Sequence, residues 1–194
     1  MRQSSIIGVI LVVLTVTASG NSAPPPQASP KEVIVKYWKF ETAGGRLTTD
    51  GWENASAFFV KLGRPPLERR ISVIAGGYAV SDVVINGNSA DVMIQILPQG
   101  QIDSKLKFTP SAAEKGAVAC HLILSGTYWS TDAGAEAPVE RTGPPEWRID
   151  GSGEIIWLEP IAAVRYVTDM KRKSNDPIVT KNADQTLSEL AKLH

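Results

Sequence analysis

The chain offers few side chains that could act as a general acid or base. It contains two histidines, His121 and His194, and the second is the last residue. Acid–base catalysis requires an imidazole or a carboxyl group in an apolar pocket, because desolvation there moves the pKa toward neutrality. His121 lies in an apolar run, and Tyr37 or Tyr128 is its candidate partner. The sequence therefore makes His121 a catalytic candidate, although a partly buried histidine with a structural role fits the same pattern.

Two aspartates form a second candidate pair. Asp82 and Asp91 lie on either side of a predicted turn, and both could reach the rim of one cavity. Carboxylates close to a turn are more often simply solvated. The pair is therefore a weaker candidate for acid–base chemistry than a histidine in a pocket.

Aromatic residues are numerous for a chain of this size. Their side chains can line a pocket for an apolar ligand, and tyrosine hydroxyl groups can supply the few polar contacts that such a ligand needs. The candidates for this role are Tyr37, Tyr78, Tyr128 and Trp147. Packing in the hydrophobic core is the alternative role for all four.

The sequence contains no motif that predicts a metal or a cofactor. Metal-ligand spacing, a nucleophile elbow and a phosphate-binding loop do not occur in it. The glycine pairs at 44–45 and 76–77 lack the spacing that cradles a phosphate. We therefore expect neither a metal nor a cofactor.

The composition indicates one globular domain behind a targeting segment. The chain has 194 residues, and 43% of them are hydrophobic, which is enough for one core. Twenty basic residues balance twenty acidic ones, and loss of a leader that contains Arg2 would leave 19 basic residues against 20 acidic ones. This balance argues against nucleic acid as a partner. Cys120, the single cysteine, cannot form an internal disulfide, and we expect a buried, inert thiol.

Residues 1–23 have the pattern of a secretory signal peptide. Arg2 precedes the apolar run 6–16, and small residues follow it. This run is too short to cross a bilayer core of about 30 Å comfortably. We expect cleavage after Ala18 or Ala23, export to the periplasm or the medium, and no stable membrane span afterwards. An uncleaved N-terminal anchor is the alternative.

Residues 79–97 predict a β-hairpin with a turn at Asn86-Gly87. If these two residues formed the centre of the turn, two aspartates would face each other across the strands and repel. We therefore expect Asn86 to pair with Ser89. The second strand alternates between apolar and polar residues, which predicts one buried face. The residues expected on that face are Ala90, Val92, Ile94 and Ile96.

The first helix is predicted by the sequence Ser29-Pro30-Lys31-Glu32, which forms a capping box with proline at the first helical position, and it should end at the glycine pair 44–45. The further elements expected are a helix over about 48–60, a strand over 71–74, a kink at 97–101 with strand residues continuing to 108, a link over 111–116, a strand over 117–130, a loop over 131–145, a strand over 146–149, and helices from about 159 to 175 and from 181 to 193.

Helices followed by a bent antiparallel sheet resemble the nuclear-transport-factor-2-like superfamily, which includes ketosteroid isomerases, polyketide cyclases and many exported bacterial domains. The segments that carry the resemblance are 31–40, 85–92 and 146–149, within residues 30–150. The resemblance implies an α+β fold in which a curved antiparallel sheet wraps around the N-terminal helices as a cone with a cavity at its wide end. Two extra C-terminal helices depart from this pattern.

This resemblance also gives the predicted domain organisation and function. We expect a signal peptide over 1–23, a proline-rich spacer over 24–29, a nuclear-transport-factor-2-like domain over 30–150 and a helical extension over 151–194. Because a fold does not settle function, we expect a non-catalytic binding or interaction module for a small apolar ligand or a protein partner. The alternative is an isomerase, dehydratase or cyclase that uses His121 or a hairpin carboxylate. The last helix could also support a homodimer.

Overall fold

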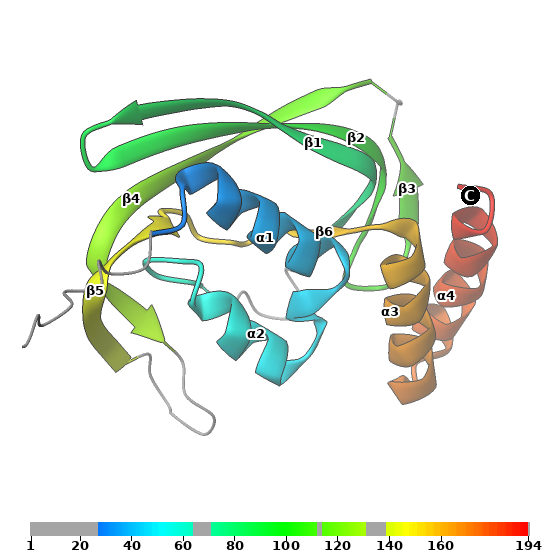
Figure 1. Cartoon of the computed structure of the whole chain (residues 1–194). Coiled ribbons are helices and arrows are strands. Elements are labelled where there is room, and N and C mark those ends of the chain that lie inside the picture. Colours follow the sequence, from blue (N-terminus) through cyan, green and yellow to red (C-terminus); the bar gives the residue numbers. More distant parts are fainter. Residues whose placement is uncertain (1–26, 64–70, 112–113, 131–138, 194) are drawn as a thin grey trace, which may run out of the picture.

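The computed structural model of the chain describes residues 27–63, 71–111, 114–130 and 139–193, and the predicted signal peptide lies outside this range. The described residues form a mixed α+β fold, in which helices pack on one curved sheet of six strands (Figure 1). This confirms the predicted class. The elements in chain order are α1 (Pro30–Thr42), η1 (Gly45–Leu47), α2 (Thr49–Ser56), β1 (Ser72–Asn86), β2 (Ser89–Ile102), β3 (Phe108–Pro110), β4 (Gly116–Ser130), β5 (Val139–Ile149), β6 (Ile156–Leu158), α3 (Pro160–Lys173) and α4 (Pro177–Leu190).

The sheet has the strand order β5-β4-β2-β1-β6, and β3 pairs with β2 as well. Paired strands run antiparallel, except β1 and β6, which run parallel. The β1–β2 hairpin has the predicted register, with Asn86 opposite Ser89 and Ile85 opposite Ala90. Gly87 in its turn has φ of 59°, a left-handed conformation that glycine adopts without strain.

Irregular pairing bends the hairpin. The glycine pair 76–77 lies opposite Leu97 alone, and the pair 81–82 lies opposite Met93 alone. An extra residue on one strand increases the local twist and bends the sheet. The sheet therefore curves, and α1 lies on its concave side (Figure 1). The predicted kink at 97–101 coincides with the first irregularity and is confirmed.

The concave face of β2 forms one of the two hydrophobic clusters. The four β2 residues predicted for the buried face are at most 5% exposed: Ala90, Val92, Ile94 and Ile96. The neighbours of these residues on the opposite face, such as Met93, are exposed. Ile34, Tyr37 and Trp38 of α1 belong to the same cluster. Burial of α1 against the bent sheet thus follows from the apolar stripe of one element and the alternation of the other.

The start of α1 is fixed by the predicted capping box. The hydroxyl of Ser29 accepts a hydrogen bond from the backbone N–H of Glu32 (3.3 Å), and the Glu32 carboxylate accepts one from the backbone N–H of Ser29 (2.7 Å). Pro30 occupies the first helical position. The helix ends before Gly44, whose φ of 88° again favours glycine.

The second helix is shorter than predicted. α2 begins at Thr49, near the predicted start, and Thr48 caps it, but the helix ends at Ser56 instead of continuing to about residue 60. After a turn at residues 57–58, the backbone pairs with the end of β5: Ile149 N–H donates to the Phe58 carbonyl (2.7 Å), and Val60 N–H donates to the Ile149 carbonyl (3.0 Å). Pairing with a sheet edge, which sequence periodicity does not reveal, therefore replaces the last helical turn.

Several predicted strand and loop boundaries were wrong. The strand predicted over 71–74 and the first strand of the hairpin form one continuous strand, β1, whose pairing is irregular at the glycine pair 76–77. The strand expected up to residue 108 is interrupted after Ile102, and the chain turns back to pair β3 with β2. In this turn the Asp103 carboxylate accepts hydrogen bonds from two backbone N–H groups, and Leu106 has φ of 59°. The prediction of a loop over 131–145 was wrong for residues 139–145, which belong to β5, and residues 131–138 lie outside the described part of the chain.

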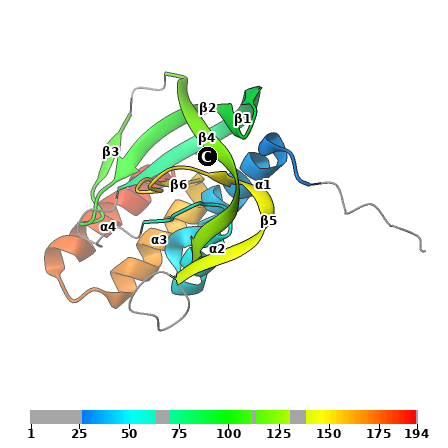
Figure 2. The same ribbon diagram turned by 90° about the vertical axis from the view of Figure 1, so that its left-hand side faces the viewer.

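The C-terminal residues add a strand to the same sheet and form much of the second hydrophobic cluster. β6, which was not predicted, pairs with β1, and α3 begins after Glu159 as expected. α4 begins at Pro177 instead of Lys181, because Asp176 caps it by accepting a hydrogen bond from Ile178 N–H (2.8 Å). Figure 2 shows α3 and α4 side by side at one end of the molecule.

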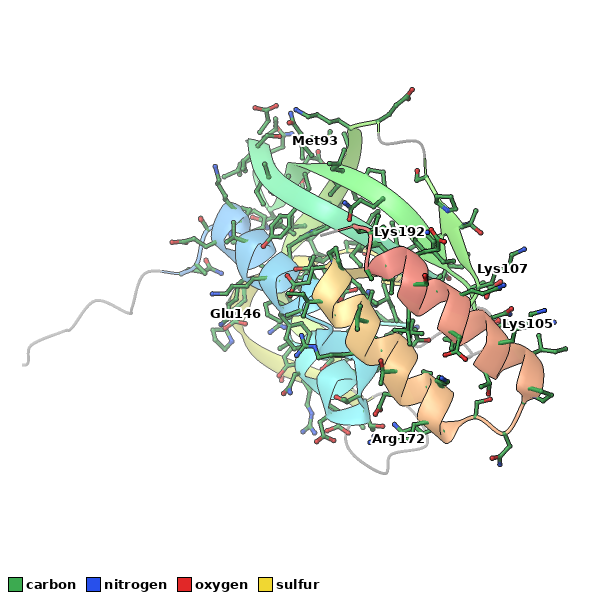
Figure 3. All side chains as sticks on the ribbon, turned by 90° about the vertical axis from the view of Figure 1, so that its right-hand side faces the viewer. Met93, Lys105, Lys107, Glu146, Arg172 and Lys192 are labelled. Atoms are coloured by element: carbon green, nitrogen blue, oxygen red, sulfur yellow. The ribbon has the colours of Figure 1, made fainter. Side chains whose placement is uncertain are left out.

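A buried hydroxyl group attaches α4 to the β2–β3 turn. Thr186 Oγ1 donates to the Leu106 carbonyl (2.7 Å) and accepts from the Phe108 N–H (3.0 Å). Figure 3 shows this end of the molecule, where Lys105 and Lys107 of the turn lie beside α4. In the described part of the chain, every helix is too short or too polar to cross a bilayer.

Candidate functional site

His121 and Asp91 are brought together, but on the exposed face of the sheet. They are direct cross-strand neighbours on β4 and β2, and the Nδ1 atom of His121 lies 2.8 Å from Oδ1 of Asp91. Their side chains are 45% and 59% exposed, respectively. Asp91 lies between two buried residues of β2, so its side chain is on the face opposite α1. The imidazole therefore lacks the apolar surroundings that acid–base catalysis requires.

The other predicted partners of these two residues lie elsewhere. Asp82 occupies the irregular part of β1, and Asp91 faces Val84 across the hairpin. Tyr37, one predicted partner of His121, is on the concave side of the sheet. Tyr128, the other, lies under the guanidinium group of Arg148, 3.8 Å from ring centroid to Cζ. No group of His, Cys, Asp or Glu side chains in the described ranges could hold a metal ion.

The four aromatic candidates are spread over the molecule. Tyr37 packs edge-on against Phe59, with ring centroids 5.1 Å apart, and lines a cavity. Tyr78 borders a different hollow next to the start of α3. Trp147 packs at the edge of the concave hydrophobic cluster. Of the four, only Tyr37 therefore belongs to the site described next.

This aromatic pocket, as we call it, has a volume of about 320 Å³ and lies between α1, β4 and the segment from 149 to 157. Aromatic and aliphatic residues, the thiol of Cys120 and the polar segment 150–154 form its lining. The aromatic residues in the lining are Tyr37, Trp38, Phe59 and Trp157, and Asp150 and Glu154 are the acidic ones. His121 borders it too, but its imidazole pairs with Asp91.

A buried ion pair holds one wall of the aromatic pocket in place. The side chains of Arg46 and Glu41 are fully buried, with Nε–Oε2 and Nη2–Oε1 distances of 2.7 and 2.6 Å. The guanidinium group also donates to the carbonyls of Gly153 and Ile155, and Glu41 accepts from the backbone N–H of Trp157. The segment that closes the pocket is thus fixed to α1 through charge-assisted hydrogen bonds.

Sequence reasoning did not identify this ion pair. Neither Glu41 nor Arg46 was among the candidate residues. A signal was present, because a glutamate on the apolar stripe of α1 is followed by an arginine just beyond the helix-ending glycines. Their main-chain partners, however, lie more than a hundred residues further along the chain, so the sequence alone could not show the whole arrangement.

Burial controls protonation in the aromatic pocket. Desolvation raises the pKa of the Tyr37 hydroxyl above its ordinary value, and the negative charge of Glu41 raises it further. Burial also raises the pKa of the Cys120 thiol, although a contact with the indole group of Trp38 partly opposes this shift. Both groups therefore stay protonated at neutral pH, and neither is poised to act as a base or a nucleophile.

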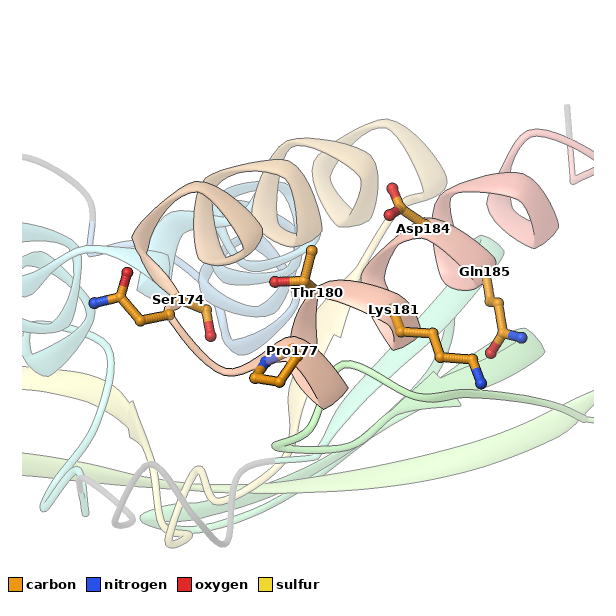
Figure 4. A pocket seen from close by; sticks show the side chains of 7 residues that line it. Ser174, Pro177, Thr180, Lys181, Asp184 and Gln185 are labelled. Carbon is orange, nitrogen blue, oxygen red and sulfur yellow. The ribbon is translucent and has the colours of Figure 1, made fainter.

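A wider hollow, of about 620 Å³, lies along the turn between α3 and α4 (Figure 4). The residues that line it come from one turn and the first part of α4, and most of them are of polar types. The residues are Ser174, Asn175, Pro177, Thr180, Lys181, Asp184 and Gln185. Ligand sites are concave, and this hollow is more open to solvent than the aromatic pocket, so it is a poorer candidate than the smaller aromatic pocket.

Comparison of the chain with protein-family models, with curated proteins and with solved structures gives no match. The resemblance to the nuclear-transport-factor-2-like superfamily therefore stays a prediction. The candidate site rests on its own geometry.

Proposed function

We propose that this chain is a non-catalytic binding module that holds a small, largely apolar ligand in the aromatic pocket. The observation that carries the proposal is the pocket itself: about 320 Å³, lined mostly by aromatic and aliphatic side chains. Small-molecule sites in proteins typically have volumes of roughly 300–1,000 Å³ and this kind of lining. The packing of α1 on the concave side of a bent sheet supports a cone-like arrangement of the nuclear-transport-factor-2-like kind.

The placement of the titratable groups favours binding over catalysis. The hydroxyl of Tyr37 and the thiol of Cys120 are held in their neutral forms by burial. His121 is engaged with an exposed carboxylate on the outer face of the sheet. A proton-transfer enzyme would need one such group, tuned toward neutrality, against the substrate. We further propose export through the N-terminal segment, which the pattern of residues 1–23 supports.

Titration with N-phenyl-1-naphthylamine tests the proposal, because this neutral probe becomes fluorescent in apolar surroundings. We expect saturable binding to the full chain. Cys120→Phe places a bulky ring at the wall of the pocket and should abolish this binding. Ala117→Phe is the matched control, since Ala117 is an exposed residue of the same strand outside the lining. Thermal melting would establish that both variants fold.

The proposal fails if the probe does not bind to the folded wild-type chain, or if Cys120→Phe and Ala117→Phe bind it equally well. A Cys120→Phe variant that does not fold would be replaced by Val118→Phe. Val118 lines the pocket from the same strand and is only partly buried. The same loss of binding is expected for that variant.

A further inference from the structure

The carboxylates at the aromatic pocket are not neutralised by neighbouring cations. Asp150 and Glu154 line the pocket, and both are exposed. Neither takes part in any salt bridge found among the described residues. The lining contains no lysine and no arginine. The pocket therefore presents an excess of negative charge to an incoming ligand.

Other charges close to the pocket balance each other. Arg46 and Glu41 form a buried pair behind one wall, so together they add no net charge. The imidazole of His121 is directed to Asp91, whose carboxylate compensates any positive charge on the ring. The carboxylates of Asp150 and Glu154 therefore add a negative charge to the field at the pocket that these two pairs do not offset.

The aromatic rings add a second source of attraction for a cation. Trp38 and Trp157 lie 5.3 Å apart between ring centroids and are inclined by 39° to each other. Trp38 is only 1% exposed and supports Trp157 from behind, whereas Trp157 is partly buried and lines the pocket, so Trp157 offers the accessible ring surface. The face of an indole ring carries negative electrostatic potential and attracts cations, with tryptophan the strongest of the aromatic side chains.

We propose that the ligand of the aromatic pocket is an organic ammonium cation, with apolar groups around its positive charge. This inference rests on the proposed function and specifies the ligand class. Aromatic faces with nearby carboxylates recognise such cations because the methyl groups are easily desolvated while the charge is attracted to both partners. A fatty acid or another apolar anion would be repelled from the same opening.

Three compounds of similar shape and different charge test the inference on the full chain. Choline is the cation, 3,3-dimethylbutan-1-ol is its neutral carbon analogue, and 3,3-dimethylbutanoate is an anion of the same shape. Binding is measured through the indole N–H signals in NMR spectra. We expect choline to bind about fivefold or more tightly than the neutral alcohol, and the anion to bind most weakly. Added salt should reduce the preference for choline.

Two kinds of variant distinguish the contribution of the carboxylates to choline binding from that of the tryptophan ring. Asp150→Asn with Glu154→Gln should lower the affinity for choline and leave that for the alcohol unchanged. Glu114→Gln, which removes an exposed carboxylate outside the lining, is the matched control. Trp157→Leu keeps an apolar side chain but removes the ring, and should lower the preference for choline as well. The first variant changes only exposed side chains, so its folding is not at risk.

The outcomes distinguish the inference from the function on which it rests. If the naphthylamine probe binds but choline binds no better than the alcohol, the inference is wrong and the binding module remains. The same conclusion follows if the variant with both Asp150→Asn and Glu154→Gln keeps the full preference for choline. If neither the probe nor any of the three compounds binds, the proposed function and the inference both fail.

Discussion

Two of the ion pairs among the described residues differ in their exposure to solvent. The side chains of Glu41 and Arg46 are fully buried between α1, η1 and the segment before β6. Asp91 and His121 lie across two strands on the outer face, and each is about half exposed. The exposed pair contains a histidine and an aspartate, the residue types that suggest acid–base chemistry in the sequence. The first pair lies behind the aromatic pocket and shapes it.

The difference follows from the solvent around each pair. A buried charge has lost its hydration, so it is tolerated only if its partner and further hydrogen bonds compensate the loss. Arg46 and Glu41 meet this condition, because three backbone groups of residues 153–157 also bind to them. An exposed pair remains hydrated with or without its partner, and contributes little. Residue type alone suggested a function for the exposed pair, whereas burial gives the other pair its structural role.

Breaking the buried ion pair should have the largest effect. Arg46→Met leaves the Glu41 carboxylate buried without its cation, and two carbonyls lose their donor. We expect the free energy of unfolding to fall by about 3–5 kcal/mol, measured by urea denaturation. Arg172→Met is the control, since Arg172 is 76% exposed in its pair with Asp169. Equal stability of the two variants would contradict the structural role given to Arg46.

The buried hydroxyl group of Thr186 provides the same kind of test for a contact between neutral polar groups. Thr186→Val keeps the size of the side chain but leaves the Leu106 carbonyl and the Phe108 N–H without their partner. We expect a loss of about 1–3 kcal/mol in the free energy of unfolding. Thr180→Val, which removes a hydroxyl group with an exposed hydrogen bond, should cost less. If the two costs are the same, α4 is not held to the sheet through Thr186.

Alkaline pH should weaken the region around the aromatic pocket. The raised pKa values of Tyr37 and Cys120 mean that the folded chain holds protons that the unfolded chain releases above about pH 10 and about pH 9, respectively. Stability is therefore fully present below these values and falls as pH rises through them. Tyr37→Phe should flatten the fall above about pH 10, as followed by urea denaturation at several pH values. An unchanged slope in this variant would mean that Tyr37 ionises freely in the folded state.

The smallest effect is expected for the exposed pair. His121→Ala removes an interaction between two hydrated side chains. We expect the free energy of unfolding to change by about 0.2–1 kcal/mol. Asp91→Asn should give a change of the same size. A loss of unfolding free energy as large as that of Arg46→Met would contradict the claim that the exposed pair contributes little to stability.

Local features of the fold could be predicted from the sequence. The capping box of α1 and the register of the hairpin depend on residues close together in the chain, and both are confirmed. The start of α4 depends on the same kind of signal, Asp176-Pro177, which was interpreted as a helix end instead of a cap. That error arose because proline both ends one helix and begins the next.

Features that depend on distant contacts could not be predicted. The end of α2 is set by pairing with β5, and β6 is a strand of three residues that exists because β1 offers it an edge. The aromatic pocket combines α1 with a segment more than a hundred residues away. Tyr37 was identified as a ligand candidate from its type alone, whereas Glu41 and Arg46 depend on a burial that no local pattern indicates.

The most direct test of the central claim asks which of the two regions responds when a ligand is added. In NMR spectra of the full chain, labelled for its indole and imidazole groups, increasing amounts of N-phenyl-1-naphthylamine are added. We predict that the signals of Trp38 and Trp157 shift in a saturable way and by more than those of the His121 ring, which borders the pocket but is directed to Asp91. A saturable shift of the His121 signals with unchanged indole signals would locate the ligand at the exposed pair and contradict the account.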